Sequence, residues 1–159
     1  MASIKTVGVD EYLNQLNTML DNSAEIAGKM VYTGAGIVAD EIKRRISQIP
    51  ERDEHGEGRQ RGITDAERAG LSESLGISRL RNDEGFFNEK IGFDGYNSYV
   101  TKKYPKGHPN SMVARTVESG TSWLQKTPFI APAVSATRNK AEKEMEKIFD
   151  NSIKKANRR

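Results

Sequence analysis

The stretch from Met112 to Ala133 constrains the fold more than any other, because it holds two rigid elements in close succession. The first is a short apolar segment, residues 112–119, closed by Gly120. Its spacing predicts a short helix, and glycine is the usual residue at the left-handed position that stops one. The second is a Pro-Phe-x-x-Pro-Ala run, in which Pro132 suits the first turn of a helix because a first-turn residue needs no amide donor. Neither element contains an obvious catalytic group.

Two long helices are predicted from apolar residues at helical spacing. The first runs from about Asp10 to Ile49 and is ended by Pro50. Glycine costs about 1 kcal/mol relative to alanine inside a helix, so residues 34–36 (Gly-Ala-Gly) predict either a break or a close approach to another backbone. The last helix covers about 131–157, and its apolar stripe is Val134, Ala141, Met145, Ile148, Phe149 and Ile153.

Between these helices the sequence predicts a small antiparallel sheet and two loops. A hairpin covers about 72–94, with a turn at 81–85 flanked by Leu75, Ile77, Leu80, Phe87, Ile91 and Phe93. Residues 51–70 are rich in glycine and mixed charges, and residues 96–110 are irregular, so both are predicted to be exposed, mobile loops. Together these elements predict a single α+β domain spanning 1–159.

Composition limits how much core the chain can build. Hydrophobic residues make up 35% and charged residues 30%, and the mean hydropathy is −0.71. Either long polar loops or burial against neighbouring subunits would explain this balance. The chain contains no cysteine, which excludes disulfides and thiolate chemistry and fits a reducing cytoplasm. No apolar run approaches the ~20 residues of a membrane span, and no signal-peptide core is visible, so we expect a soluble, intracellular protein.

The charge is mildly basic, with a net charge of +3 and a pI of about 9.1. Basic residues number 25 and acidic residues 22, so most charges should be interspersed. One tight cationic cluster stands at the C-terminus. Favourable pairing with a helix C-terminal dipole explains it best, and a nucleic-acid-binding tail remains the alternative. The DNA-facing candidates are therefore Lys154, Lys155, Arg158 and Arg159.

No residue pattern predicts catalysis or metal binding. His55 lies among acidic residues, but its glycine-rich loop would not hold ligands at fixed geometry. His108 lies in another loop with no carboxylate close in sequence. The run Ser119-Gly120-Thr121 lacks the flanking pattern of a nucleophile elbow. We therefore predict no enzyme activity, cofactor or metal.

The residues singled out are interface candidates instead. Glu118 is interpreted as a local cap that accepts amide hydrogen bonds around the Gly120 turn, or as half of a salt bridge between subunits. Arg115 is the local candidate for its partner. Trp123 lies in a variable loop and suits an interface, whereas Phe129 is expected to pin the last helix to the sheet. The interface candidates are Arg115, Glu118, Gly120, Thr121, Trp123 and Phe129.

The same stretch resembles the tail-completion, or head-to-tail joining, proteins of long-tailed double-stranded DNA bacteriophages and their prophages. Members read roughly Ala-x-x-Val-Glu-x-Gly-Thr, then a variable loop, then Pro-Phe-x-x-Pro-Ala. The matching positions are Ala114, Val117, Glu118, Gly120, Thr121, Pro128, Phe129, Pro132 and Ala133. The resemblance covers the C-terminal third, and the remainder only by element order. Where the family has a short Pro-x-x-Thr-Gly-x-Leu link, residues 51–70 form a long insertion, after which Leu71-x-x-Ser74-Leu75 again resembles the family.

The resemblance implies a structural virion protein, made in the host cytoplasm, that occupies the neck between head and tail. Its copies would form a ring, six-fold to match the tail tube, around a channel whose wall is weakly positive or mixed in charge. The implied partners are a head-closure or connector protein, the tail tube or tail terminator protein, and DNA passing without sequence specificity, with no membrane. Three alternatives stay open: a tail terminator or another neck or minor tail component, a small nucleic-acid-binding protein, and a toxin-like or regulatory enzyme.

Overall fold

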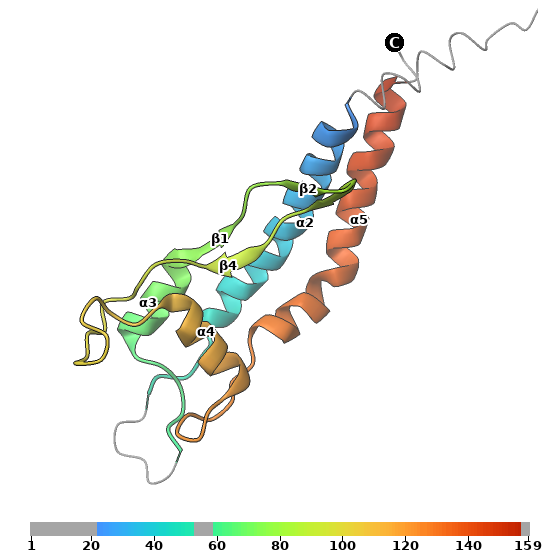
Figure 1. The fold of residues 1–159 in the computed structure, drawn as a ribbon. Coiled ribbons are helices and arrows are strands. Elements are labelled where there is room, and N and C mark those ends of the chain that lie inside the picture. The colour runs from blue at the N-terminus through green and yellow to red at the C-terminus, as the bar shows by residue number, and fades with distance from the viewer. Residues whose placement is uncertain (1–21, 53–58, 157–159) are drawn as a thin grey trace, which may run out of the picture.

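Two long antiparallel helices dominate the molecule. A computed structural model describes residues 22–52 and 59–156. Helix α2 (Ser23–Ile46) lies along helix α5 (Ile130–Ala156), and the shorter helices α3 (Asp65–Ser74) and α4 (Asn110–Ser119) gather near one end of the pair (Figure 1). These helices, together with a small set of antiparallel strands, confirm the predicted α+β class. In the described residues, no helix is long and apolar enough to cross a membrane.

The strands form one hairpin in two sections. Strand β1 (Leu75–Ile77) pairs antiparallel with β4 (Ile91–Phe93), and β2 (Arg81–Asp83) pairs antiparallel with β3 (Phe86–Asn88). The hairpin is confirmed, but it starts at Leu75, because residues 72–74 belong to α3.

The hairpin turn is tighter than predicted. It has two residues, Glu84 and Gly85, with φ of 53° and 93°, in place of the longer turn expected at 81–85. A two-residue turn with positive φ at both positions matches the right-handed twist of the flanking strands, so it can replace a longer connection.

The core lies where α3, α4 and the first turn of α5 meet the C-terminal half of α2. Its fully buried side chains include Phe129, Ile46, Ile63, Leu71 and Val117. The Phe129 ring packs edge-on against Phe93 of β4, with ring centroids 6.1 Å apart. Phe129 therefore pins α5 to the sheet, as predicted. It is only 2% exposed, so its place among the interface candidates is wrong.

The contact between α2 and α5 explains the glycines of α2. The helix runs unbroken through residues 34–36, so a break there is excluded. A Cβ on Gly34 would lie 2.7 Å from Sδ of Met145 on α5, whereas nothing lies within 4 Å of one on Gly36. The close approach is thus to a side chain and not to a backbone. Helix α2 ends at Ile46, before the predicted Ile49, and the part predicted at 10–21 lies outside the described residues.

The predicted loop at 51–70 is wrong for its second half. Helix α3 begins at Asp65, and Ile63, Glu67 and Leu71 are buried. Thr64 caps the helix through a capping box with Glu67, in which each side chain binds the other residue's backbone amide. Residues 53–58 lie outside the described residues.

The irregular segment at 96–110 is confirmed as far as Pro109, and Asn110 starts α4. It is not uniformly exposed. Asn97 is buried and exchanges hydrogen bonds with His108, whose amide donates to Asn97 Oδ1 at 3.2 Å. Gly107 has a φ of 93°, and a Cβ there would lie 1.8 Å from the Asn97 carbonyl oxygen, so only glycine fits this closure.

Candidate functional site

The Glu118 carboxylate joins α4 to the start of α5. It accepts hydrogen bonds from the amides of Phe129 (2.7 Å), Ile130 (2.8 Å) and Ala131 (2.9 Å). The first amides of a helix have no partner within the helix, so an external carboxylate satisfies them and also interacts favourably with the helix dipole. Glu118 is therefore a cap, but of α5 and not of the Gly120 turn where we expected it.

This geometry changes the acidity of Glu118. Burial alone would raise the pKa of its carboxyl, but the amides of Ile130, Ala131 and Phe129, together with Lys126, hold that pKa below its usual value. Both carboxylate oxygens are engaged within the chain. Arg115 is exposed, and no ion pair joins it to Glu118 in the described structure, so Arg115 is not the local partner that the sequence suggested.

Gly120 and Thr121 shape the loop that follows α4. Gly120 has a φ of 73°, and a Cβ there would lie 3.0 Å from the amide nitrogen of Lys126. The Leu124 amide donates to Thr121 Oγ1, and the Thr121 amide donates to the Leu124 carbonyl, both at 2.9 Å. This tight turn leaves Trp123 51% exposed at its edge. Trp123 thus remains a candidate for an interface, whereas Gly120 and Thr121 have structural roles within the chain.

A cavity of about 320 Å³ opens beside this loop. Its apolar wall is built by α4, the loop and the residues before α3, namely Ile63, Met112, Val113, Val117 and Leu124. Its polar wall contains Arg52, Glu67 and His108, and Lys103 and Trp123 also line it. Lys103 and Trp123 are exposed to solvent, so we place the mouth of the cavity at these two side chains.

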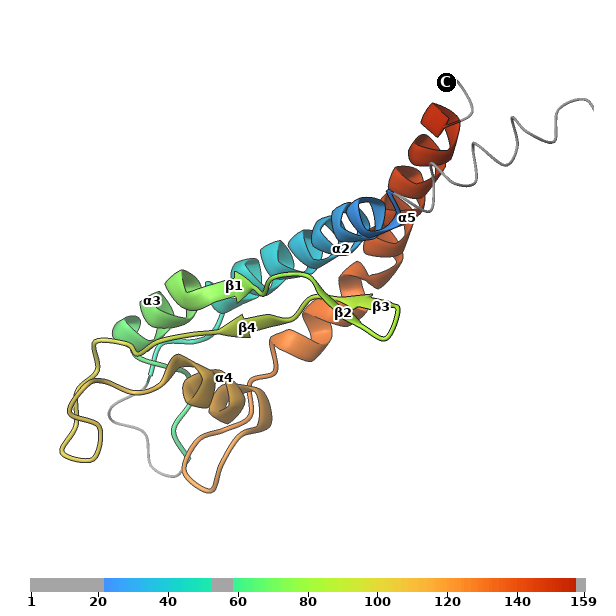
Figure 2. The same cartoon turned by 45° about the horizontal axis from the view of Figure 1, so that its top comes forward.

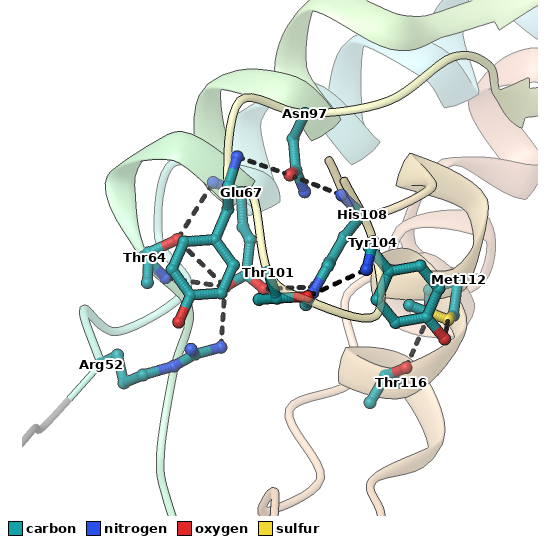
Figure 3. A network of polar contacts seen from close by, with 10 residues as sticks. Arg52, Thr64, Glu67, Asn97, Thr101, Tyr104, His108, Met112 and Thr116 are labelled. Carbon is teal, nitrogen blue, oxygen red and sulfur yellow. Dashed lines mark hydrogen bonds and ion pairs between the residues drawn. The ribbon is translucent and has the colours of Figure 1, made fainter. Parts of the chain in front are cut away.

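Glu67 is the centre of the polar wall (Figure 3). It is 3% exposed, and its Oε2 accepts hydrogen bonds from Arg52 Nη2 (2.7 Å), Thr64 N (3.0 Å) and Thr64 Oγ1 (3.1 Å). Its Oε1 lies 3.7 Å from His108 Nδ1. This one carboxylate therefore joins residue 52 to the start of α3, with the His108 ring of the loop before α4 beside them.

His108 is fixed by aromatic neighbours. Its ring packs edge-on between Tyr99 and Tyr104, with centroid distances of 5.2 and 4.7 Å, and its Nε2 lies 3.5 Å from Thr101 Oγ1. His108 has no carboxylate close in sequence, as we noted, but Glu67 lies beside it in space because it comes from a different element. The Thr64-x-x-Glu67 pattern was the available signal for α3 and its buried acid.

The polar groups of the cavity wall are largely engaged within the chain. Glu67 already accepts three hydrogen bonds, and 3.7 Å is too long for a hydrogen bond to His108. The two threonine hydroxyls that line the cavity are committed to the backbone, since Thr116 donates to the Met112 carbonyl and Thr121 accepts from the Leu124 amide. The Tyr104 hydroxyl donates to Met112 Sδ at 3.5 Å. The hydroxyl beside the His108 imidazole is that of Thr101, which accepts a hydrogen bond from the Tyr104 amide and does not line the cavity.

The remaining predicted sites are the C-terminal cations and the acidic run around His55. Lys154 and Lys155 lie exposed in the last turn of α5, where cations interact favourably with the helix dipole, and Arg158 and Arg159 lie outside the described residues. The acidic run around His55 also lies outside them. Among residues 22–52 and 59–156, no group of three or more His, Cys, Asp or Glu side chains could hold a metal ion.

Comparison with family models, curated proteins and solved structures gave no match to this chain. Its function is therefore inferred from its own residues and their geometry.

Proposed function

We propose that this chain is a structural virion protein of a tailed phage, which completes the tail and joins it to the head at the neck. The observation that carries the proposal is the physical unit formed by residues 112–133. The two sequence clusters behind the resemblance meet through Glu118, which binds the amides that open α5. The carboxylate of Glu118 can cap α5 only when the Pro-Phe-x-x-Pro-Ala helix start follows it. This dependence explains why the two sequence clusters occur together.

The long helices support the expected ring of copies. Tyr32 on α2 and Val134 and Phe149 on α5 are exposed. An open groove of about 360 Å³ between the two helices and β4 is lined by Val31, Gly34, Ala35, Val38, Ile91, Val134, Ala141 and Met145, with Glu89, Arg138 and Glu142. Neighbouring copies would cover this apolar surface. Burial against neighbouring subunits would then explain the low hydrophobic content of the chain.

In this role the protein binds through surfaces and catalyses nothing. One face of the ring would meet a head-closure or connector protein and the other the tail tube or tail terminator protein, with DNA passing through the centre. Exposed ion pairs outside this groove, such as Lys29–Glu25 on α2 and Lys147–Glu144 on α5, keep local charge balanced. Balanced charge suits a channel through which DNA must slide, since strong phosphate binding would oppose transit.

The test is electron microscopy of lysates in which the gene is interrupted. We expect DNA-filled heads and separate finished tails that do not join, and joining should return when the intact gene is supplied in trans. Normal joined particles would contradict the proposal. Tails of irregular length would point instead to a tail terminator. Filter binding with DNA at increasing salt tests the nucleic-acid alternative, which requires an affinity that falls steeply with salt.

A further inference from the structure

We infer a specific contact between copies: the β2–β3 hairpin tip of one copy inserts Phe86 into the 320 Å³ cavity of the next copy. The inference deepens the proposed function, because it assumes that copies assemble with one another. It assigns the cavity a ligand, namely an aromatic side chain flanked by acids on a second copy of this chain.

The hairpin tip presents Phe86 rigidly. Phe86 is 77% exposed, the highest value among the large exposed hydrophobic residues of the described chain. Its turn is held by a hydrogen bond from the Gly85 amide to Asn82 Oδ1, and Asn88 Nδ2 donates to Asp83 Oδ2, both at 2.8 Å. A single exposed hydrophobic residue is ordinary on a surface. A phenylalanine on a tight, internally bonded turn is different, because little conformational entropy is lost when it binds.

The cavity offers the matching surface. Its volume of about 320 Å³ lies at the lower end of the ~300–1,000 Å³ typical of ligand pockets, which suits one aromatic anchor better than a cofactor. Val113, Val117 and Leu124 supply an apolar wall, and Trp123 stands half-exposed where a second ring could pack. Aromatic anchors in such pockets carry much of the binding energy of an interface.

Charge gives the contact its direction. The tip carries Asp83 and Glu84 next to Phe86, and all three are exposed. At the cavity, Arg52 is already paired with Glu67, whereas Lys103 has no ion pair within the described part of the chain and lies 5.6 Å from the Tyr104 ring centroid. An acidic tip therefore meets a cation that is free to pair with it, which favours encounter in this orientation.

The two surfaces lie too far apart for one chain to satisfy itself. In Figures 1 and 2 the β2–β3 tip lies partway along the helix pair, with β3 against α2, whereas α3 and α4, which border the cavity, lie at the other end of the hairpin. The contact must therefore join different surfaces of two copies. Such head-to-tail contacts generate rings when the rotation closes and filaments when it does not.

Site-directed cross-linking tests the contact in the full chain. The protein has no cysteine, so a short bismaleimide reacts only with introduced thiols. Glu84→Cys places one at the tip, leaving Asp83 and Phe86 intact, and Ser122→Cys places one between the cavity residues Thr121 and Trp123, leaving Lys103 intact. A mixture of these two variants should give a several-fold higher yield of covalent dimer than a mixture of Glu84→Cys with Lys140→Cys. Lys140 is exposed on α5 and serves as the control. Equal yields from the two mixtures would overturn the inference.

Two further variants test the anchor and the charge. Phe86→Ala in the Glu84→Cys chain should reduce the dimer several-fold, whereas Tyr96→Ala, which removes another exposed aromatic residue away from the two long helices, should not. In cysteine-free chains, Glu84→Lys and Lys103→Glu should each weaken self-association in sedimentation velocity, and the double variant should recover it. A cross-link that is indifferent to Phe86 would exclude Phe86 as the anchor.

The outcomes separate this contact from the neck role. If lysates without the gene contain joined particles while the cross-link forms, the neck role fails and the contact stands. If joining needs the gene but the tip and cavity thiols do not react above the control, the contact fails and the neck role stands.

Discussion

Two carboxylates satisfy the free amides at the starts of α3 and α5, by different routes. Glu67 lies inside the helix that it caps and reaches back to the amide of Thr64. Glu118 reaches across from α4 to amides that lie eleven to thirteen residues further along the chain. Each also joins separate segments, because Glu67 binds Arg52 and Glu118 binds the start of α5. Much of the tertiary structure around the cavity therefore depends on these two acids.

Glu118→Ala should lower the free energy of unfolding by about 1–2 kcal/mol at neutral pH, the usual cost of removing a helix cap. Urea denaturation would measure it. Glu142→Ala on α5 is the control, because its carboxylate pairs with Arg138 in solvent and such pairs are worth about 1 kcal/mol or less. Equal losses in both variants would contradict the capping role.

The contribution of Glu118 should also depend on pH. Because the pKa of its carboxyl is lower in the folded chain than its ordinary value of about 4.5, the folded state prefers the charged form. The stabilisation is therefore fully present above pH about 4.5 and is lost as the pH falls through the lowered folded pKa. In urea titrations, the difference between the natural chain and Glu118→Gln should shrink progressively in acid. A difference that is constant down to pH about 2 would contradict the lowered pKa.

Glu67→Gln should be more costly, about 3 kcal/mol or more, because it leaves the Arg52 guanidinium without its anion in a site from which water is largely excluded. The side chains of Arg52 and Glu67 are only 13% and 4% exposed. Asp65→Asn in the same helix is the matched control, since Asp65 is 83% exposed and lies 3.8 Å from Arg68. Thermal or urea unfolding of the two variants should differ clearly, and similar values would mean that the buried pair contributes little.

At the scale of elements, the α2–α5 contact depends on the one glycine that faces Met145. Gly36→Ala should stabilise the protein by about 0.5–1 kcal/mol, because alanine is the better helix former and the new methyl group meets nothing. Gly34→Ala gains the same helix propensity but places the new Cβ 2.7 Å from Met145 Sδ. Either α5 must shift or the Met145 side chain must move. The free energy of unfolding should therefore be lower for Gly34→Ala than for Gly36→Ala, and equal values would contradict the close approach.

The elements that could be predicted from the sequence are those with a local signal. Regular apolar spacing predicts α5 and most of α2, and Gly120 and Pro132 mark the ends of neighbouring helices where the structure has them. Helix α3 was missed because it buries little apolar surface besides Leu71, and because its flanking glycines suggested a loop. Its capping box was a local signal that could have found it. The contacts of Glu118 with α5 and of Glu67 with Arg52 and His108 join distant segments, so no spacing rule could have predicted them.

At the scale of the whole molecule, burial is uneven. Ile42 and Ile46 of α2 are buried beside α3 and α4, but from Ser23 to Gly34 the only residue of α2 that is buried is Gly34 itself. On α5, the described residues after Ala141 are all at least partly exposed, including the apolar Met145, Ile148, Phe149 and Ile153. A helix pair whose apolar side chains are half covered gains stability from any neighbour that covers them, and the proposed ring would supply such neighbours.

If copies of the chain are these neighbours, thermal stability should depend on protein concentration. Only the folded chain assembles, so a tenfold rise in concentration should add about 1 kcal/mol per subunit and raise the Tm by about 2–4 °C. Phe149→Ser should weaken this dependence and lower the Tm of dilute samples less than that of concentrated ones, because Phe149 is 45% exposed in the single chain. Val100→Ser is the control, since Val100 is exposed in the loop before α4 and far along the chain from both long helices. Scanning calorimetry over a hundredfold range of concentration, combined with sedimentation velocity, would measure both effects. A Tm that does not change with concentration, in a protein that stays monomeric throughout, would mean that the exposed apolar side chains of α2 and α5 await a different partner.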